Sequence, residues 1–475
     1  MQLTFWGAAR QVTGSMFLLT LEDGFKLLID CGLDMNRSPE YSDNPYGFFP
    51  FDPSTVHALI LTHAHIDHSG YIPNLIRDGF EGTIYCTAPT AALSRILLDD
   101  SASLHQKKLK KLASTRNEQK RARILRDMGG DAKAFFMHRQ VEEAVEHFRH
   151  IPFGKRVKVL DGVFLTFNPT SHLLGAANVL LEIDEAGQTK KICFSGDIGR
   201  KNYPLLPDPQ PIPLVDYLIC ESTYGNRRHQ HAENQEEILF EIIQDVCVKK
   251  QGRLIIPAFS VGRSQALLYV IHKLCEAGKL PPIKIFSDSP LALQSTRIYE
   301  AHRSWLSGDA QAFAQQYGSL FNFENLVYIE NLKESKAIDH YPEPCVIISS
   351  SGMIQGGRIE HHVRQNLANP NATILMVGFA AEGTFGHELL QGVKEVEFKK
   401  KPIPVLARIE SIDSFSGHGD LDDLLAFINT QDKQQLKKLF LVHGEYTSMQ
   451  AFKLTLEGQG FHQVEIPERG QTFDL

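Results

Sequence analysis

The chain has 475 residues, of which 43% are hydrophobic and 22% charged, and its formal net charge is −7. This composition is typical of a globular protein with the mass of about three domains, and it excludes an intrinsically disordered chain. The negative charge argues against a general nucleic-acid coat protein, because the molecule as a whole repels phosphate. A local basic groove remains compatible with it.

The N-terminus and the cysteines indicate the compartment. Residues 1–6 lead directly into a strand-like pattern, without the basic start and long apolar stretch of a secretory signal. No apolar run approaches the roughly 18 residues that span a bilayer. The seven cysteines are scattered and form no CxxC pair, which argues against disulfides and against a thiolate metal site. We therefore expect a cytoplasmic protein without a membrane partner, in which most cysteines are small core residues.

Short apolar, β-rich runs alternate with helical stretches along the chain, and this alternation predicts an α/β class. The clearest strand predictions are residues 25–30, 56–62, 191–195, 217–220, 253–257, 345–349 and 439–442. Several of these runs end in a polar or glycine-containing turn, as strands do at the functional edge of a sheet.

The segment Ser101–Gly130 differs from this pattern, because it is rich in basic residues and poor in apolar ones. Its basic residues are Lys107, Lys108, Lys110, Lys111, Lys120, Arg121, Arg123 and Arg126. The segment predicts an exposed helical excursion. A solvated helix face and a basic arm that faces the substrate are equally compatible with it.

The most informative motif places three histidines and one aspartate within six residues, directly after a predicted strand. Its members are His63, His65, Asp67 and His68. Side chains alternate along an extended chain, so His63 and His65 point the same way, while Asp67 and His68 can face a second point nearby. Imidazole nitrogen and carboxylate oxygen suit zinc. An unpaired buried cluster of this kind would be costly, so the motif predicts a metal site.

Three single residues at predicted strand ends can complete such a site. They are His172, Asp197 and His443, and each lies next to a glycine or in a turn-like context. Alone, His172 or His443 is equally compatible with a hydrogen-bonded loop histidine. The presence of the first motif favours metal ligation for all three.

These motifs resemble the metallo-β-lactamase superfamily, whose signature is HxHxDH followed by single His, Asp and His motifs. The resemblance implies a four-layer αββα sandwich with two Zn²⁺ per chain. One zinc would be bound by His63, His65 and His172 and the other by Asp67, His68 and His443, with Asp197 bridging them. Asp30 matches the first motif of the superfamily and would orient a ligand. Its alternative role is a turn cap after the strand.

Three further features resemble the β-CASP subgroup, the nucleic-acid-processing branch of the superfamily. Glu221, His418 and His443 match its motifs A, B and C, and the long interval between Glu221 and His418 implies an inserted α/β domain. The opening residues 7–15 are similar to relatives of the endonuclease subunit of the cleavage and polyadenylation specificity factor. We expect domain limits of 1–225, 226–405 and 406–475, with the β-CASP insert in the middle.

Within this subgroup a histidine at motif C is associated with RNA, so His443 favours single-stranded RNA as the partner. The resemblance implies hydrolysis by metal-bound hydroxide, leaving 5′-phosphate and 3′-hydroxyl ends. His418, oriented by Glu221, would be the general acid, and Asp67 and Asp197 would complete the catalytic set. Internal cutting is expected, and 5′-to-3′ trimming and a homodimer stay open. The alternatives are a DNA nuclease and a small-molecule metallohydrolase.

Three glycine- or serine-rich segments of the insert are candidates for phosphate contacts. The first follows a predicted strand and opens a helix, the second ends an apolar strand, and the third is predicted as a flexible loop. Their candidate residues are Ser260 and Arg263, then Ser349, Ser350, Ser351 and Gly352, and finally Gly383, Thr384 and His387. The resemblance makes them the RNA-facing wall, although many relatives have a basic residue at the position of His387.

Overall fold

A computed structural model describes the chain except for residues 35–47, 127–133, 186, 230–233, 379 and 399–400. The end of the basic segment, residues 127–130, and one residue of the third glycine-rich loop, Phe379, lie outside the described residues. The chain forms two compact units. The first unit comprises residues 1–201, 208–228 and 418–475, and the second unit comprises residues 202–207 and 229–417.

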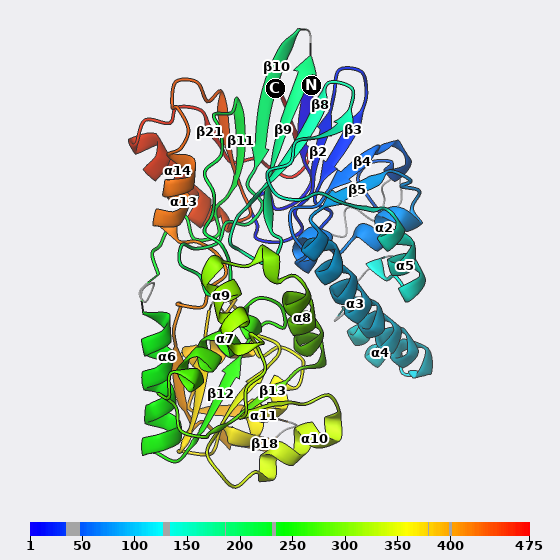
Figure 1. The fold of residues 1–475 in the computed structure, drawn as a ribbon. Helices are drawn as coiled ribbons and strands as arrows, with labels where there is room; N and C mark the ends of the chain where they lie inside the picture. Colours follow the sequence, from blue (N-terminus) through cyan, green and yellow to red (C-terminus); the bar gives the residue numbers. More distant parts are fainter. Residues whose placement is uncertain (35–47, 127–133, 186, 230–233, 379, 399–400) are drawn as a thin grey trace. The chain divides into compact units, whose positions relative to one another are not determined.

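Two seven-stranded sheets form the centre of the first unit (Figure 1). The first sheet has the order β22 (Gln471–Asp474), β1 (Gln2–Phe5), β2 (Phe17–Thr20), β3 (Lys26–Ile29), β4 (Ala58–Ile60), β5 (Thr83–Cys86) and β6 (Phe148–His150). The second sheet has the order β21 (Val464–Glu465), β20 (Lys438–Val442), β11 (Tyr217–Glu221), β10 (Gln188–Phe194), β9 (Ala177–Glu185), β8 (Val163–Pro169) and β7 (Val157–Leu160).

Alternation of side chains along the strands gives each sheet two buried faces. Phe5 and Ile29 of the first sheet pack with Phe194 and Phe440 of the second in the core between the sheets. The outer face of the first sheet packs on α2 (Ile72–Arg77), α3 (Ala88–Ser114) and α5 (His138–Glu146). The outer face of the second sheet packs on α13 (Leu421–Ile428) and α14 (Tyr446–Gly458). Figure 1 shows these helices on opposite sides of the sheet pair, which confirms the predicted αββα sandwich.

The second unit is built on a six-stranded sheet in which every pair of neighbouring strands is parallel. Its order is β14 (Leu326–Tyr328), β13 (Lys284–Asp288), β15 (Cys345–Ser349), β12 (Arg253–Pro257), β16 (Ala372–Met376) and β19 (Arg408–Ser411). The central strands are buried on both faces, which explains why they are continuous apolar runs. A small hairpin of β17 (Glu395–Phe398) and β18 (Lys401–Pro404) is also present.

Helices connect the parallel strands of this sheet. They are α7 (Arg263–Glu276), α8 (Pro290–Ala301), α9 (Gly308–Tyr317), α10 (Leu332–Ala337), α11 (Ile359–Asn366) and α12 (Phe385–Leu390), while α6 (Gln235–Ile243) and a π-helical turn at Gln244–Lys249 precede β12. Because parallel strands share one direction, their carboxyl ends meet at one edge of the sheet, where binding residues of α/β folds gather.

The limits of the compact units can be compared with the domain limits expected from the sequence. The units divide at Arg228/His229 and at Gly417/His418, whereas the expected limits are 225/226 and 405/406. The second difference arises because β19 pairs with β16 and thus extends the sheet of the second unit.

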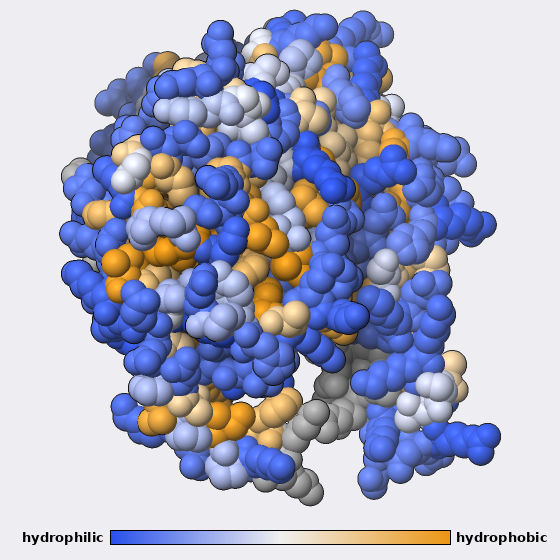
Figure 2. All heavy atoms as spheres, turned by 60° about the horizontal axis from the view of Figure 1, so that its bottom comes forward, coloured by the Kyte–Doolittle hydropathy of each residue, from blue (hydrophilic) through white to orange (hydrophobic). Residues whose placement is uncertain are grey.

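The basic segment is helical, as expected. It forms the outer part of α3 and the whole of α4 (Glu118–Arg126), and its described side chains are largely exposed. Six of the seven cysteines are buried, and none forms a disulfide. The face drawn in Figure 2 is largely hydrophilic, with apolar residues gathered in parts of it. Among the described helices, none has the length and apolar character that crossing a membrane requires.

Candidate metal centre

The histidine-rich motif lies in a tight turn between a strand and a helix. β4 ends at Ile60, and the short helix α1 (Ile66–Ser69) begins directly after His65, so that Asp67 and His68 lie in its single turn. The loop after β3 packs against this turn. A Cβ atom on Gly32 would lie 1.6 Å from the Asp67 carbonyl oxygen, so only glycine allows this approach.

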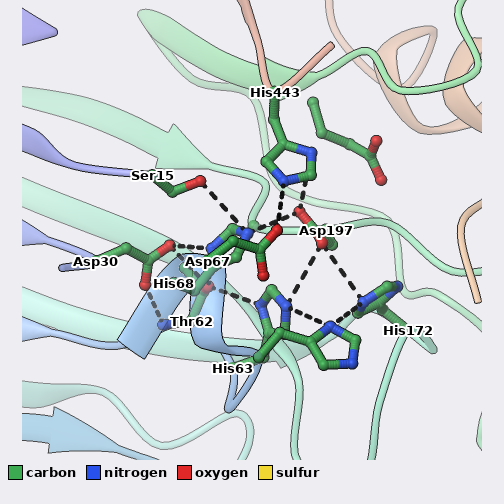
Figure 3. A network of polar contacts seen from close by, with 12 residues as sticks. Ser15, Asp30, Thr62, His63, Asp67, His68, His172, Asp197 and His443 are labelled. Carbon is green, nitrogen blue, oxygen red and sulfur yellow. Dashed lines mark hydrogen bonds and ion pairs between the residues drawn. The ribbon is translucent and has the colours of Figure 1, made fainter. Parts of the chain in front are cut away.

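Four side chains bring one donor atom each to a common point, and Figure 3 shows three of them with labels. These are His63, His65, His172 and Asp197. His65 Nδ1 lies 3.2 Å from His63 Nε2 and 3.0 Å from His172 Nε2. Asp197 Oδ2 lies 3.4 Å from both His63 Nε2 and His172 Nε2.

These distances test whether the residues fit a zinc ion. Ligand atoms at 2.0–2.1 Å from a tetrahedral zinc are about 3.3 Å from one another. The measured separations of 3.0 to 3.4 Å agree with this value. Asp197 Oδ1 is also buried and accepts no hydrogen bond from the residues that the structure describes. The donor set therefore fits a metal ion.

A second group of donors lies on the other side of Asp197 and comprises Asp67, His68 and His443. His443 Nε2 lies 3.4 Å from Asp67 Oδ2, and His68 Nε2 lies 3.2 Å from Asp197 Oδ1. The two carboxylate oxygens of Asp197 thus face different histidine groups (Figure 3). The structure brings together all seven residues that the sequence singles out for metal.

Asp30 contacts the Nδ1 atom of His68, whose Nε2 atom faces Asp197. Its Oδ2 atom lies 2.7 Å from His68 Nδ1, and its Oδ1 atom accepts a hydrogen bond of 2.8 Å from the Thr62 backbone N–H. Asp30 is buried, and its carboxylate contacts both His68 and the Thr62 backbone. Such a carboxylate fixes the orientation and tautomer of the imidazole that it contacts.

Sequence reasoning missed three hydroxyl groups at this site. Thr62 Oγ1 lies 3.1 Å from His63 Nδ1, Ser15 Oγ lies 3.3 Å from His68 Nε2, and Thr223 Oγ1 lies 3.1 Å from His443 Nδ1. Thr62 directly precedes the histidine motif and Thr223 follows Glu221 by two residues. That adjacency is the only signal in the sequence that could have indicated them.

The electrostatics of the site favour a bound cation. Burial lowers the pKa of His63 and lowers that of His65 to about 4, so both imidazoles are neutral donors near pH 7. Burial also lowers the pKa of His68, but Asp197 and Asp30 outweigh it and raise this pKa well above its usual value. The carboxylates therefore attract positive charge to the position that His68 faces.

His418 and Glu221 form a third group with Asp197. His418 Nδ1 lies 3.1 Å from Glu221 Oε1, and its Nε2 lies 3.8 Å from Asp197 Oδ2. Glu221 is held in turn by the backbone N–H of Ile198 at 2.7 Å and of Thr223 at 3.1 Å. Burial lowers the pKa of His418, but Glu221 and Asp197 raise it to about 9, so this imidazole is protonated near neutral pH.

Backbone strain gathers around the same residues. Asp30, Ser171 and His443 have φ values of 58°, 62° and 50°, in the left-handed region that non-glycine residues avoid. All three lie in the turns that follow strands β3, β8 and β20. Such strain persists only where surrounding structure compensates for it, and it is common at functional sites.

The substrate-binding candidates lie in the second unit. Ser260, Ser349 and Ser350 lie at the carboxyl ends of β12 and β15 or in the loops that follow. The Ser289 hydroxyl joins two of them, lying 3.3 Å from Ser260 Oγ and 3.0 Å from Ser350 Oγ.

The other candidates in this unit have local partners. Arg263 begins α7, donates a 3.2 Å hydrogen bond to the Phe415 carbonyl and lies over the Phe259 ring. Ser351 Oγ donates to the Gln355 carbonyl, and Gly352 approaches the Phe259 ring.

The predicted loop through His387 is wrong at its end, because α12 begins at Phe385. Thr384 caps this helix by accepting a 3.3 Å hydrogen bond from the His387 backbone N–H. Gly383, with a φ of 80°, provides the turn before the cap. His387 therefore lies in the first turn of a helix and not in a loop.

Comparisons with known proteins agree with this geometry. Residues 9–222 match the metallo-beta-lactamase superfamily, residues 264–389 match the Beta-Casp domain, and residues 402–467 match the Zn-dependent metallo-hydrolase RNA specificity domain.

Similar proteins include Ribonuclease TTHA0252 of Thermus thermophilus, with 32% identity over 97% of this chain and 97% of that protein. An RNase J-like protein of Methanocaldococcus jannaschii is 30% identical over 98% of both chains. Transcription termination factor FttA of Methanosarcina mazei is 27% identical over 94% of this chain and 67% of that protein.

A solved structure of a protein of unknown function from Enterococcus faecalis covers 100% of this chain and 99% of its own, with a TM-score of 0.53 and 14% identity, and supports the fold alone. The family matches and the two relatives at or above 30% identity confirm the predicted family. The chain belongs to the β-CASP group of the metallo-β-lactamase superfamily, a group of metal-dependent hydrolases.

Proposed function

We propose that this chain is a zinc-dependent ribonuclease that hydrolyses RNA phosphodiester bonds and leaves 5′-phosphate and 3′-hydroxyl ends. The observation that carries the proposal is the position of Asp197. Its carboxylate faces two groups of metal-type donors and also the His418–Glu221 pair. Metal ligands and a protonated histidine therefore lie around one carboxylate.

Two zinc ions are the proposed cofactor. His63, His65 and His172 would hold one, and Asp67, His68 and His443 the other, with Asp197 shared between them. When bound, such a pair supplies a nucleophile from water at neutral pH and neutralises charge on the phosphate. Asp30 would keep His68 in place as a ligand through their 2.7 Å contact.

His418 is the proposed general acid. Glu221 fixes its Nδ1 atom, so the Nε2 atom is directed towards Asp197 and is the one that can donate a proton to a leaving oxygen. The proton is available at neutral pH because the two carboxylates raise the pKa of His418 to about 9. A phosphodiester has a poor leaving group, so proton donation lowers the barrier to cleavage.

RNA is the proposed substrate on two grounds. The relatives include proteins named as ribonucleases, and residues 402–467 match an RNA specificity domain. His443 occupies the position at which RNA-acting members of the subgroup carry histidine. We further propose that Ser260, Ser349 and Ser350, with the other candidates of the second unit, contact the RNA, and that the free cysteines reflect a cytoplasmic location.

The test is to incubate the zinc-loaded protein with 5′-labelled and 3′-labelled RNA of defined sequence, alongside DNA of matched sequence and a panel of esters and lactones. We expect RNA fragments with 5′-phosphate ends. Fragments from internal positions would show endonuclease action, and release of mononucleotides from the 5′ end would show trimming. Products with 2′,3′-cyclic phosphates would contradict the mechanism. Faster cleavage of DNA than of RNA, or cleavage of the esters or lactones alone, would show that RNA is not the substrate.

A further inference from the structure

The outer part of α3 and the described part of α4 together carry a dense set of basic side chains, which we term the basic arm. Its members are Lys107, Lys108, Lys110, Lys111, Arg116, Lys120 and Arg121. All seven are exposed, and Glu118 is the single acidic residue between Lys107 and Arg121. This concentration of positive charge contrasts with the net charge of −7 of the whole chain.

No side chain of the basic arm forms an ion pair within the portion of the chain that the structure describes. Lys107 and Lys111 are four residues apart in α3, so they are neighbours on the helix surface, and both are positively charged. Like charges at this spacing destabilise a helix by about 0.2–0.5 kcal/mol per pair. An ordinary solvated helix face instead alternates acidic and basic residues. The arm is therefore complementary to a polyanion.

The basic arm does not contribute to the hydrophobic core. The inner part of α3 packs through Leu98 and Ala102 on Phe136 and Val141. Beyond this cluster, Leu104 is 48% exposed. Figure 1 shows α3 extending away from the sheets of its unit, with α4 beside its outer end. With 27 residues, α3 is more than twice as long as the roughly 12 residues of an average helix, and Ala102 is the last of its fully buried residues.

The other end of α3 is fixed to the loop that carries His172. The hydroxyls of Thr87 and Thr90 both donate to the Gly175 carbonyl, at 2.8 and 3.0 Å. A helix rises about 1.5 Å per residue, so Lys107 lies roughly 28 Å along the axis from Ala88. A strand of nucleic acid in helical form advances about 3.4 Å per nucleotide, so about eight nucleotides span that distance.

We propose that the basic arm binds the phosphate backbone of RNA about eight or more nucleotides from the bond that is cut. The proposal rests on the proposed ribonuclease function and adds a second binding surface to it. Binding through lysine and arginine alone carries no base specificity. The arm would therefore increase affinity for long RNA of any sequence and leave short RNA unaffected.

The test replaces four lysines of the arm in the full chain, as Lys107→Gln, Lys108→Gln, Lys110→Gln and Lys111→Gln. Glutamine forms helices about as well as lysine, so α3 should persist. Binding is measured by fluorescence anisotropy with the zinc-loaded His418→Ala protein, which should cut slowly, over a series of salt concentrations. For an RNA of about 30 nucleotides we expect the slope of log K against log salt to fall by about three, since each single-strand phosphate contact contributes about 0.7.

Two matched variants serve as controls. Replacing the exposed Lys155, Lys158, Lys433 and Lys437 of the same unit by glutamine removes the same charge elsewhere and should leave the slope unchanged. Arginine at positions 107, 108, 110 and 111 keeps the charge and should retain binding, even if the glutamine variant folds poorly. An RNA of about 5 nucleotides should bind all variants about equally at the metal centre, because it is too short to contact the arm at the same time.

Binding of the same variants to vesicles containing phosphatidylserine is measured in parallel. Three outcomes would overturn the proposal: an unchanged slope in the folded glutamine variant, an equal fall of the slope in the Lys155 control set, or a loss of vesicle binding in the glutamine variant without a loss of RNA binding. Failure of the proposed ribonuclease function would give a different result: the zinc-loaded wild-type protein would cut neither the long nor the short RNA. The salt slope therefore reports on the arm, and cleavage reports on the metal centre.

Discussion

Two buried aspartates, one in each unit, show how differently a carboxylate can be accommodated at the end of a strand. Asp288 in the second unit accepts three short contacts, of 2.6 Å from His362 Nε2, 2.5 Å from Ser335 Oγ and 2.6 Å from Arg358 Nη1. Asp197 in the first unit faces five histidine nitrogens, all at 3.2 to 3.8 Å. Both side chains are fully buried.

The difference in distance indicates a difference in role. Asp288 is satisfied by donors of the protein itself, as a buried charge must be in a structural cluster. Four of the five contacts of Asp197, at 3.4 to 3.8 Å, are too long for good hydrogen bonds. Those to His63, His68 and His172, at 3.2 to 3.4 Å, match the spacing of ligands around a metal. A bound cation would balance the charge of this buried carboxylate, which lacks close donors of its own.

Asp197→Ala should have the largest effect on the metal centre. This change removes the residue that both groups of donors share, so the protein should lose metal as well as turnover. The loss of activity should exceed the 10- to 100-fold effect typical of a residue that only supports a ligand. Elemental analysis of the purified protein and an RNA cleavage assay measure the two quantities. If the variant retains its zinc, Asp197 is not a ligand shared by the two zinc ions.

His418→Ala should separate chemistry from metal binding. We expect the variant to keep its metal content and to lose about 10²- to 10⁴-fold in rate, the usual contribution of a general acid. Metal content and cleavage rate are measured on the same preparation. Full activity would exclude His418 as the acid, whereas loss of metal would make it a ligand.

Asp30→Asn should have a smaller effect on the same centre. The amide keeps the shape of the side chain but loses the charge that orients His68 through their 2.7 Å contact. We expect metal affinity or activity to fall by about 10- to 100-fold. Competition with a chelator measures the affinity. An unchanged affinity would show that Asp30 serves only as a partner of Thr62.

Asp288→Asn should leave the metal centre untouched and reduce stability instead. Burial raises the pKa of Asp288, but hydrogen bonds from His362, Ser335 and Arg358 outweigh it and hold the pKa below its usual value. Removing one partner of a buried ion pair costs about 3–5 kcal/mol in the free energy of unfolding.

The effect of this change should depend on pH. A carboxylate whose pKa is lowered in the folded state adds stability above its unfolded pKa of about 3.9 and loses it as the pH falls through the folded value. The difference between wild type and variant should thus be complete at pH 7 and shrink below about pH 4. Denaturant unfolding at several pH values measures it. Loss of zinc in this variant would contradict the different roles assigned to Asp288 and Asp197.

The metal centre around Asp197 and the cluster around Asp288 also differ in how much of each the sequence predicts. His63, His65, Asp67 and His68 are close in sequence, so their chemistry is evident without a structure. Asp288 and His362 are 74 residues apart and belong to no local pattern, so only the fold brings them together.

Residues that support the site were harder to predict than its ligands. Thr62 and Ser15 are hydroxyl residues of a common kind, and nothing in their spacing marks them. The start of α12 was missed because Gly383 and Thr384 are also typical of a loop. The hydroxyl of Thr384 caps the helix only when the following residues turn. Strands β12 and β15, by contrast, were predicted from their continuous apolar runs.

An anomalous diffraction map recorded at the zinc edge from crystals of the full chain would test the proposed two-zinc centre. We predict two peaks, one enclosed by His63, His65 and His172 and the other by Asp67, His68 and His443, with Asp197 between them. A map without zinc among these seven side chains, or with both peaks elsewhere in the molecule, would contradict it.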